Sequence, residues 1–165
     1  MNAKDAIVQV HKTAEGVYDA YLDGLSDADL LIRPVAGQNH IAWQLGHLIA
    51  TERTFLEALK PGSSPALPDG FEVAHGRDEA STTSDDAGRF LTKEKYLSLL
   101  KAQREATLQY VDRLADNGLD VPAPEKYLQR MPTVGAVLMM NGSHYLMHAG
   151  QLVSVRRKLG KPIAI

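Results

Sequence analysis

The chain has 165 residues, 44% hydrophobic and 23% charged, so it is long enough to bury the core of one globular domain. With 18 basic and 20 acidic side chains, the formal net charge is −2. This balance argues against a nucleic-acid binder, because such proteins draw affinity from a basic excess. The absence of cysteine excludes disulfides, thiolate metal sites and cysteine nucleophiles. Any transition metal must therefore be bound by imidazole nitrogen or by oxygen.

The N-terminal segment does not have the pattern of a targeting sequence. Lys4, Asp5 and Lys12 stand where a signal peptide would need an unbroken apolar core. No run approaches the roughly 18 apolar residues of a membrane-spanning helix. We therefore expect a cytoplasmic protein without a membrane segment, folded as a single domain over residues 1–165.

Apolar residues recur at helical spacing in four long stretches, and no alternating strand pattern accompanies them. The first predicted helix covers residues 3–25, and a short capped turn over 27–31 follows it. The second predicted helix covers residues 39–59, where a Lys-Pro-Gly sequence interrupts the pattern. The sequence thus predicts an all-α protein.

Capping residues mark the two helices of the C-terminal half. The third predicted helix covers residues 93–116 behind Thr92, whose hydroxyl can accept hydrogen bonds from the first amides. The fourth covers residues 134–159 and is followed by Gly160, at a position where a left-handed backbone is common. Together the four stretches predict a four-helix bundle.

The connection between the second and third predicted helices, residues 61–91, is long and rich in Pro, Gly, Ser and Asp. Compact bundles join antiparallel neighbours with roughly 2–8 residues. A helix of about 20 residues is about 30 Å long, which this connection can span. We expect a crossover along the full height of the bundle, which leaves the two helices parallel and partly covers a functional site.

Two histidines of the fourth predicted helix, His144 and His148, are spaced for a shared ligand. Four residues advance a helix by about 6 Å and turn it by about 40°, so both imidazoles project from one face and can bind one ion. That face carries the apolar residues of the helix, so the pair should point into the bundle or its mouth. The alternative is a pair of core histidines bonded to carbonyl groups.

His47, in the middle of the second predicted helix, is the expected third ligand. The adjacent Gly46 would let another backbone approach closely. Three neutral nitrogens leave coordination positions open for water or substrate, as in catalytic sites. The divalent ion can be Zn²⁺, Ni²⁺, Fe²⁺ or Mn²⁺, because imidazole binds all of them.

The remaining histidines are assigned no role at the metal. His11 is expected to be a hydrogen-bonded residue at the boundary of the core. His40 should lie near the start of the second helix, and His75 should be solvated in the long connection.

Glu52 and Tyr145 are further catalytic candidates. Glu52 continues the apolar stripe of its helix, so an inward carboxylate would orient a bound histidine or accept a proton. The alternative is a carboxylate at the rim of the bundle, paired with Arg53 or with a neighbouring helix. Tyr145 either donates a hydrogen bond from its hydroxyl to a substrate or is a core residue whose hydroxyl has a partner inside the protein. Trp43 either walls the pocket or packs in the core.

Three motifs lie far apart in the chain: HIAWQLGHL at residues 40–48, HxxxHxGQ at residues 144–151 and RxxLG at residues 156–160. Together they resemble the DinB/YfiT-like superfamily of bacterial metal-dependent enzymes. The resemblance covers nearly the whole chain, and the first two motifs together are more specific than either alone. It implies a four-helix bundle with up-down-down-up connectivity, frequently assembled as a homodimer.

The resemblance also implies a metal site, with His47, His144 and His148 as the ligands. Family members of known activity use the metal to activate a low-molecular-weight thiol for isomerisation or for sulfur transfer to an electrophile. A thiol S-transferase acting on a small molecule is therefore the expected function. The alternatives are a metal-dependent hydrolase with the same ligands and a non-catalytic metal-binding stress-response protein.

Overall fold

The computed structural model describes residues 1–78 and 82–163. Within these residues the regular structure is helical, apart from an isolated β-bridge between Pro122 and Thr133. The long helices are α1 (Ala3–Leu22), α2 (Ile41–Leu59), α5 (Lys93–Arg113) and α6 (Val134–Lys158). The short elements are η1 (Asp29–Leu31), α3 (Phe71–Ala74), η2 (Ala87–Arg89) and η3 (Glu125–Tyr127). The predicted all-α class is confirmed.

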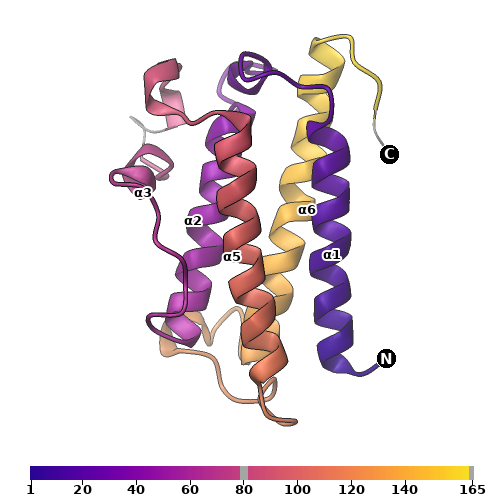
Figure 1. Ribbon diagram of the computed structural model, residues 1–165, viewed down its shortest axis with the longest axis vertical. Coiled ribbons are helices and arrows are strands. Elements are labelled where there is room, and N and C mark those ends of the chain that lie inside the picture. Colours follow the sequence, from indigo (N-terminus) through magenta and orange to yellow (C-terminus); the bar gives the residue numbers. More distant parts are fainter. Residues whose placement is uncertain (79–81, 164–165) are drawn as a thin grey trace.

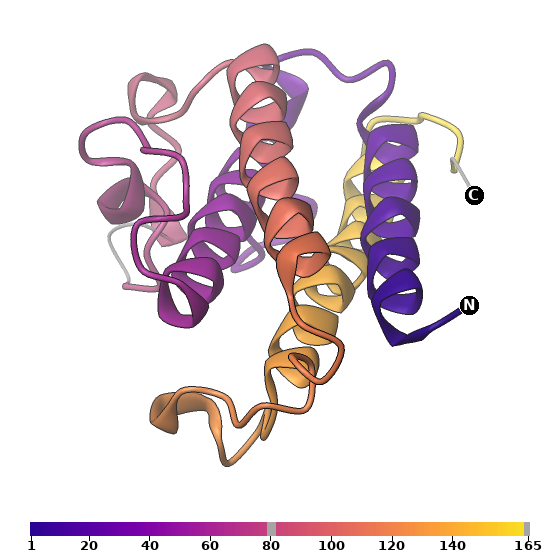
Figure 2. The same cartoon turned by 60° about the horizontal axis from the view of Figure 1, so that its bottom comes forward.

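The four long helices stand side by side in Figure 1, where the chain colours show α1 and α6 rising and α2 and α5 descending. Helix α1 packs mainly on α6, and α2 packs on both α5 and α6. The connection between α2 and α5 carries α3, which contacts α2. Figure 2 shows this connection outside α2, and the loop with η3 projecting from one end of the molecule. Two irregular segments therefore flank α2.

Each long helix begins behind a residue whose side chain accepts a hydrogen bond from the first turn. These residues are Asn2, His40, Thr92 and Thr133. The helix ends differ more from the prediction, because α1 stops at Leu22 and α5 at Arg113, each three residues early. Gly24 has a left-handed backbone with φ of 68°, whereas the chain after α5 becomes extended at Leu114.

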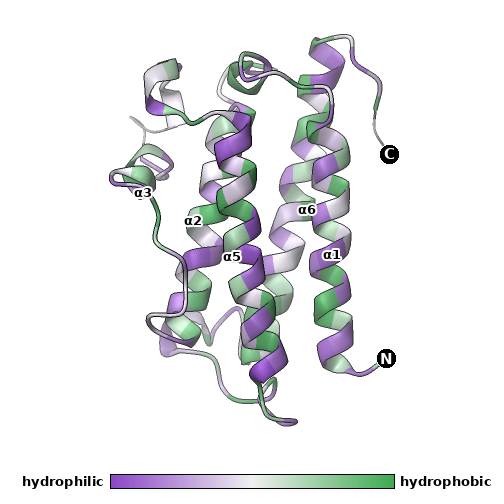
Figure 3. Cartoon of the chain, viewed as in Figure 1, coloured by the Kyte–Doolittle hydropathy of each residue, from purple (hydrophilic) through white to green (hydrophobic). Residues whose placement is uncertain are grey.

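Helix α2 is the most enclosed element. Its residues 41–49 are all buried, whereas polar and apolar residues alternate along α1 and α5 in Figure 3, as expected for helices with one exposed face. The polar side chains Gln44, His47 and Glu52 of α2 are therefore buried and need partners inside the protein. No described helix has an apolar stretch long enough to cross a membrane.

Candidate metal centre

Three histidines converge between α2 and α6. His47 lies on α2, His144 and His148 lie one turn apart on α6, and one ring nitrogen from each forms a group within 4.8 Å of one another. The ring centroids of His144 and His148 are 4.8 Å apart, and that of His47 is 5.3 Å and 5.4 Å from them. His47 and His148 are buried, and His144 is half-buried. The fold thus brings together all three predicted ligands.

Gln44 fixes the tautomer of His148. The amide Nε2 of Gln44 donates to the carbonyl oxygen of Asn39 at 2.9 Å, which directs Oε1 toward Nδ1 of His148 at 3.2 Å. Because a carboxamide oxygen only accepts, Nδ1 carries the hydrogen and Nε2 keeps its lone pair for an ion. Sequence reasoning missed this role, although Gln44 lies three residues before His47 on the same helix.

Trp43 supports the ring of His47. The two rings stack in parallel, with centroids 4.8 Å apart and an interplanar angle of 6°. The indole Nε1 donates to the carbonyl oxygen of Gly76 at 3.1 Å, so Trp43 also ties α2 to the connection outside it. The indole is buried, and by packing against the ring of His47 it holds this predicted ligand in place.

Burial keeps the three imidazoles neutral at physiological pH. It lowers the pKa of His47 to about 3 and the pKa of His148 to about 4, and neighbouring imidazoles add to both effects. Burial, followed by the charge of Arg77, also lowers the pKa of His144. Neutral imidazole is the form that binds metal. Among the described residues, His47 and His144 have no hydrogen-bond partner, so the donor set fits a divalent transition metal.

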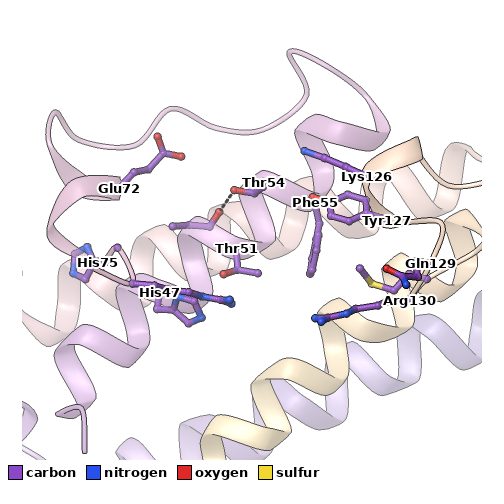
Figure 4. A pocket seen from close by; sticks show the side chains of 14 residues that line it. His47, Thr51, Thr54, Phe55, Glu72, His75, Lys126, Tyr127, Gln129 and Arg130 are labelled. Carbon is purple, nitrogen blue, oxygen red and sulfur yellow. Dashed lines mark hydrogen bonds between the residues drawn. The ribbon is translucent and has the colours of Figure 1, made fainter. Parts of the chain in front are cut away.

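His47 also lines a cavity of about 660 Å³, a size within the range of about 300–1,000 Å³ typical of small-molecule sites. Figure 4 shows the cavity between α2, the segment that carries Glu72 and His75, and the loop that carries η3. Phe55 and Tyr127 form an aromatic wall, with ring centroids 5.3 Å apart. The ligand cluster is therefore connected to a space large enough for a small substrate.

The sequence pattern of the DinB superfamily matches residues 11–152, a region that includes all three clustered histidines. This chain belongs to the DinB superfamily. No curated protein and no solved structure gives a significant match. The superfamily assignment predicted from the histidine motifs is confirmed.

In this member of the DinB superfamily, the prediction that His75 is solvated is wrong. His75 is buried, its Nδ1 donates to the carbonyl oxygen of Phe71 at 2.7 Å, and its Nε2 accepts from the hydroxyl of Tyr96 at 2.7 Å. The ring lies against Gly46, where a Cβ atom would be 2.0 Å from Cδ2 of His75. Gly46 thus permits a close approach, but by an imidazole instead of the expected backbone. Local loop composition does not reveal such tertiary burial.

The other two histidines are structural. His40 is the N-cap of α2, so the prediction that it lies near the start of this helix is confirmed. Its Nε2 donates to the carbonyl oxygen of Ser84 at 3.1 Å. His11 bonds through Nε2 to the carbonyl oxygen of Leu138 at 3.0 Å, but it is fully buried, so its predicted boundary position is wrong. Burial lowers the pKa of His11 to about 4.

Glu52 is at the centre of a buried network that links all four long helices. Arg104 donates Nε to Oε1 of Glu52 at 3.0 Å and Nη2 to Oε2 at 3.2 Å. Tyr145 donates its hydroxyl to Oε2 at 2.7 Å, and Nη1 of Arg104 donates to the carbonyl oxygen of His11 at 2.9 Å. The carboxylate thus faces inward, as predicted, and is paired with a neighbouring helix, whereas the alternative of a carboxylate at the rim is wrong because Glu52 is fully buried.

The network determines the charge state of Glu52. Burial alone would raise the pKa of its carboxyl group, but the Arg104 guanidinium and the Tyr145 hydroxyl hold the pKa below its usual value. Neither Glu52 nor Tyr145 is among the residues that line the cavity. Sequence reasoning missed Arg104, which stands among polar residues of α5 and has no local sign of burial.

Proposed function

We propose that this protein is a metal-dependent thiol S-transferase, an enzyme that joins a low-molecular-weight thiol through its sulfur to a small electrophile. The observation that carries the proposal is the convergence of His47, His144 and His148 beside a cavity of about 660 Å³. All three donors are imidazoles, a ligand set that suits Zn²⁺, Ni²⁺, Fe²⁺ or Mn²⁺. Three protein ligands are also the number found in catalytic sites that keep a position for substrate.

A divalent ion held by these histidines supplies Lewis acidity, which lowers the pKa of a thiol that it binds. In the transfer, the thiol releases its proton to solvent and its sulfur forms a bond to the electrophilic carbon. The bond from that carbon to its leaving group breaks, and the leaving group takes the electron pair. The chain contributes orientation, because Gln44 and Trp43 fix two of the rings that would hold the ion.

Glu52 and Tyr145 enter this proposal as positioning residues. Their hydrogen bond of 2.7 Å joins α2 to α6, the two helices that carry the proposed ligands. Glu52 lies five residues after His47, and Tyr145 is the neighbour of His144. The bond therefore restrains the relative position of the two helices next to the cluster.

We also propose that residues 1–165 form one up-down-down-up bundle that acts as a homodimer in the cytoplasm. The directions of the long helices in Figure 1 support the connectivity. Exposed methionines on α6 support the dimer, because Met139 and Met140 are each 40% exposed and Met147 is 62% exposed.

Turnover by the metal-loaded protein tests the activity. We expect it to conjugate a low-molecular-weight thiol with an activated aryl chloride, and His148→Ala to lower kcat/KM by about 100-fold or more. The matched control is Arg157→Ala, which changes an exposed side chain on the same helix and should retain activity. Lack of thiol-dependent turnover with the metal loaded, or hydrolysis in water alone, would contradict the proposed transfer.

A further inference from the structure

Three cationic side chains line the cavity beside His47: Arg77, Lys126 and Arg130. They come from two segments that are distant in the chain, the connection after α3 and the loop around η3. Lys126 lies over the ring of Tyr127, with its Nζ 4.9 Å from the ring centroid. Because the whole chain has a net charge of −2, this local excess of positive charge is not a consequence of overall composition.

Anionic groups within the described chain do not balance these cations. Glu72 is the acidic residue among the described lining residues, and its Oε1 accepts from Nη1 of Arg53 at 3.1 Å. In the part of the chain that the structure describes, no carboxylate forms an ion pair with Arg77 or Arg130. Cations that share a cavity without counter-charges repel one another, and a bound anion would remove that repulsion.

The three cations line the same cavity as His47 of the histidine cluster. Figure 4 shows Arg130 extending into the cavity from the side opposite His47. Arg77 follows Gly76, whose carbonyl oxygen accepts the indole hydrogen bond of Trp43, the residue stacked on His47. An anion held by these side chains would therefore lie next to the proposed ion.

We infer that this cavity binds a small organic oxyanion, with its carboxylate or phosphate group against Arg77, Lys126 and Arg130. The guanidinium group is suited to both anions because it offers parallel N–H donors. The aromatic wall of Phe55 and Tyr127 would contact the apolar part of the same molecule. The role of this oxyanion as part of a substrate rests on the proposed function, since it would belong to the thiol or to the electrophile.

Trp43 provides a direct assay, because it is the sole tryptophan of the chain. We would titrate the protein, with and without added zinc, with succinate and with inorganic phosphate while recording Trp43 fluorescence. The neutral analogue succinamide and sodium chloride at equal ionic strength are the controls. We expect a saturable change with succinate or phosphate and none with succinamide or chloride.

Arg130→Gln should weaken binding of the same probe by about tenfold or more, because it removes a charge-assisted contact. The matched control is Arg113→Gln on α5, an exposed arginine that does not line the cavity, and it should leave Kd unchanged. Both substitutions are at exposed positions, and thermal unfolding would verify that both variants fold. An equal response to succinamide or chloride, or an unchanged Kd in Arg130→Gln, would overturn the inference.

The zinc-free titration separates this inference from the proposed function. Anion binding that Arg130→Gln weakens, in a protein that takes up no metal, would support the oxyanion site and contradict the metal enzyme. Metal uptake without anion binding would support the metal site and contradict the oxyanion site. Turnover assays of Arg130→Gln would then identify the substrate that carries the oxyanion. A KM that rises in this variant only for a carboxylated electrophile would assign the oxyanion to the electrophile. A KM that rises only for the thiol would assign it to the thiol.

Discussion

Replacement of Arg104 by methionine is expected to lower the free energy of unfolding by about 3–5 kcal/mol. The substitution leaves the carboxylate of Glu52 buried with Tyr145 as its remaining partner, and it removes the donor to the carbonyl oxygen of His11. An uncompensated buried charge is costly, whereas the methionine fills much of the vacated volume. Denaturant unfolding followed by circular dichroism measures the effect.

Two variants show whether this loss comes from the buried charge. Arg113→Met removes an exposed arginine from the same helix and should change stability by less than about 0.5 kcal/mol. The double variant Glu52→Leu with Arg104→Met should recover much of the loss, because an apolar replacement of a buried ion pair is often neutral. Equal losses in the two arginine variants would show that the network does not stabilise the fold.

Gly46→Ala is expected to lower the free energy of unfolding by about 1–3 kcal/mol, although alanine is the better helix former. The new Cβ would lie 2.0 Å from Cδ2 of His75. His75 is not free to move away, because Phe71 and Tyr96 hold both of its ring nitrogens. The segment around α3 must shift instead, and thermal unfolding measures the cost.

Gly16→Ala in α1 is the matched control. A Cβ at Gly16 meets nothing within 4 Å, so alanine there should raise stability by up to about 1 kcal/mol. The two glycine variants should therefore have effects of opposite sign. A stabilising effect of Gly46→Ala would contradict the close contact between the imidazole of His75 and Gly46 of α2.

The fold class was predictable because its determinants are local. Apolar spacing marked the long helices, and capping side chains such as Thr92 marked their starts. The pairing of His144 with His148 was equally predictable, since four residues on one helix fix their relative direction. His47 was chosen from its place in the middle of the second helix beside Gly46, but its convergence with the pair depends on the packing of α2 against α6.

Other parts of the site depend on contacts between distant segments, which spacing alone does not show. His75 lies in a sequence typical of a loop but is buried by its contacts with Gly46 and Tyr96. Arg77 and Arg130 line one cavity although they are far apart in the chain. The chemistry of a residue is readable from the sequence, but its partners are set by tertiary packing.

The metal content of the purified protein, before and after reconstitution with divalent ions, tests the central claim most directly. We predict about one tightly bound ion per chain, lost in His47→Ala, His144→Ala and His148→Ala but retained in Arg157→Ala, a change of an exposed side chain on α6. Undiminished metal content in the three histidine variants, or no binding by the unaltered chain, would contradict a shared ion between α2 and α6.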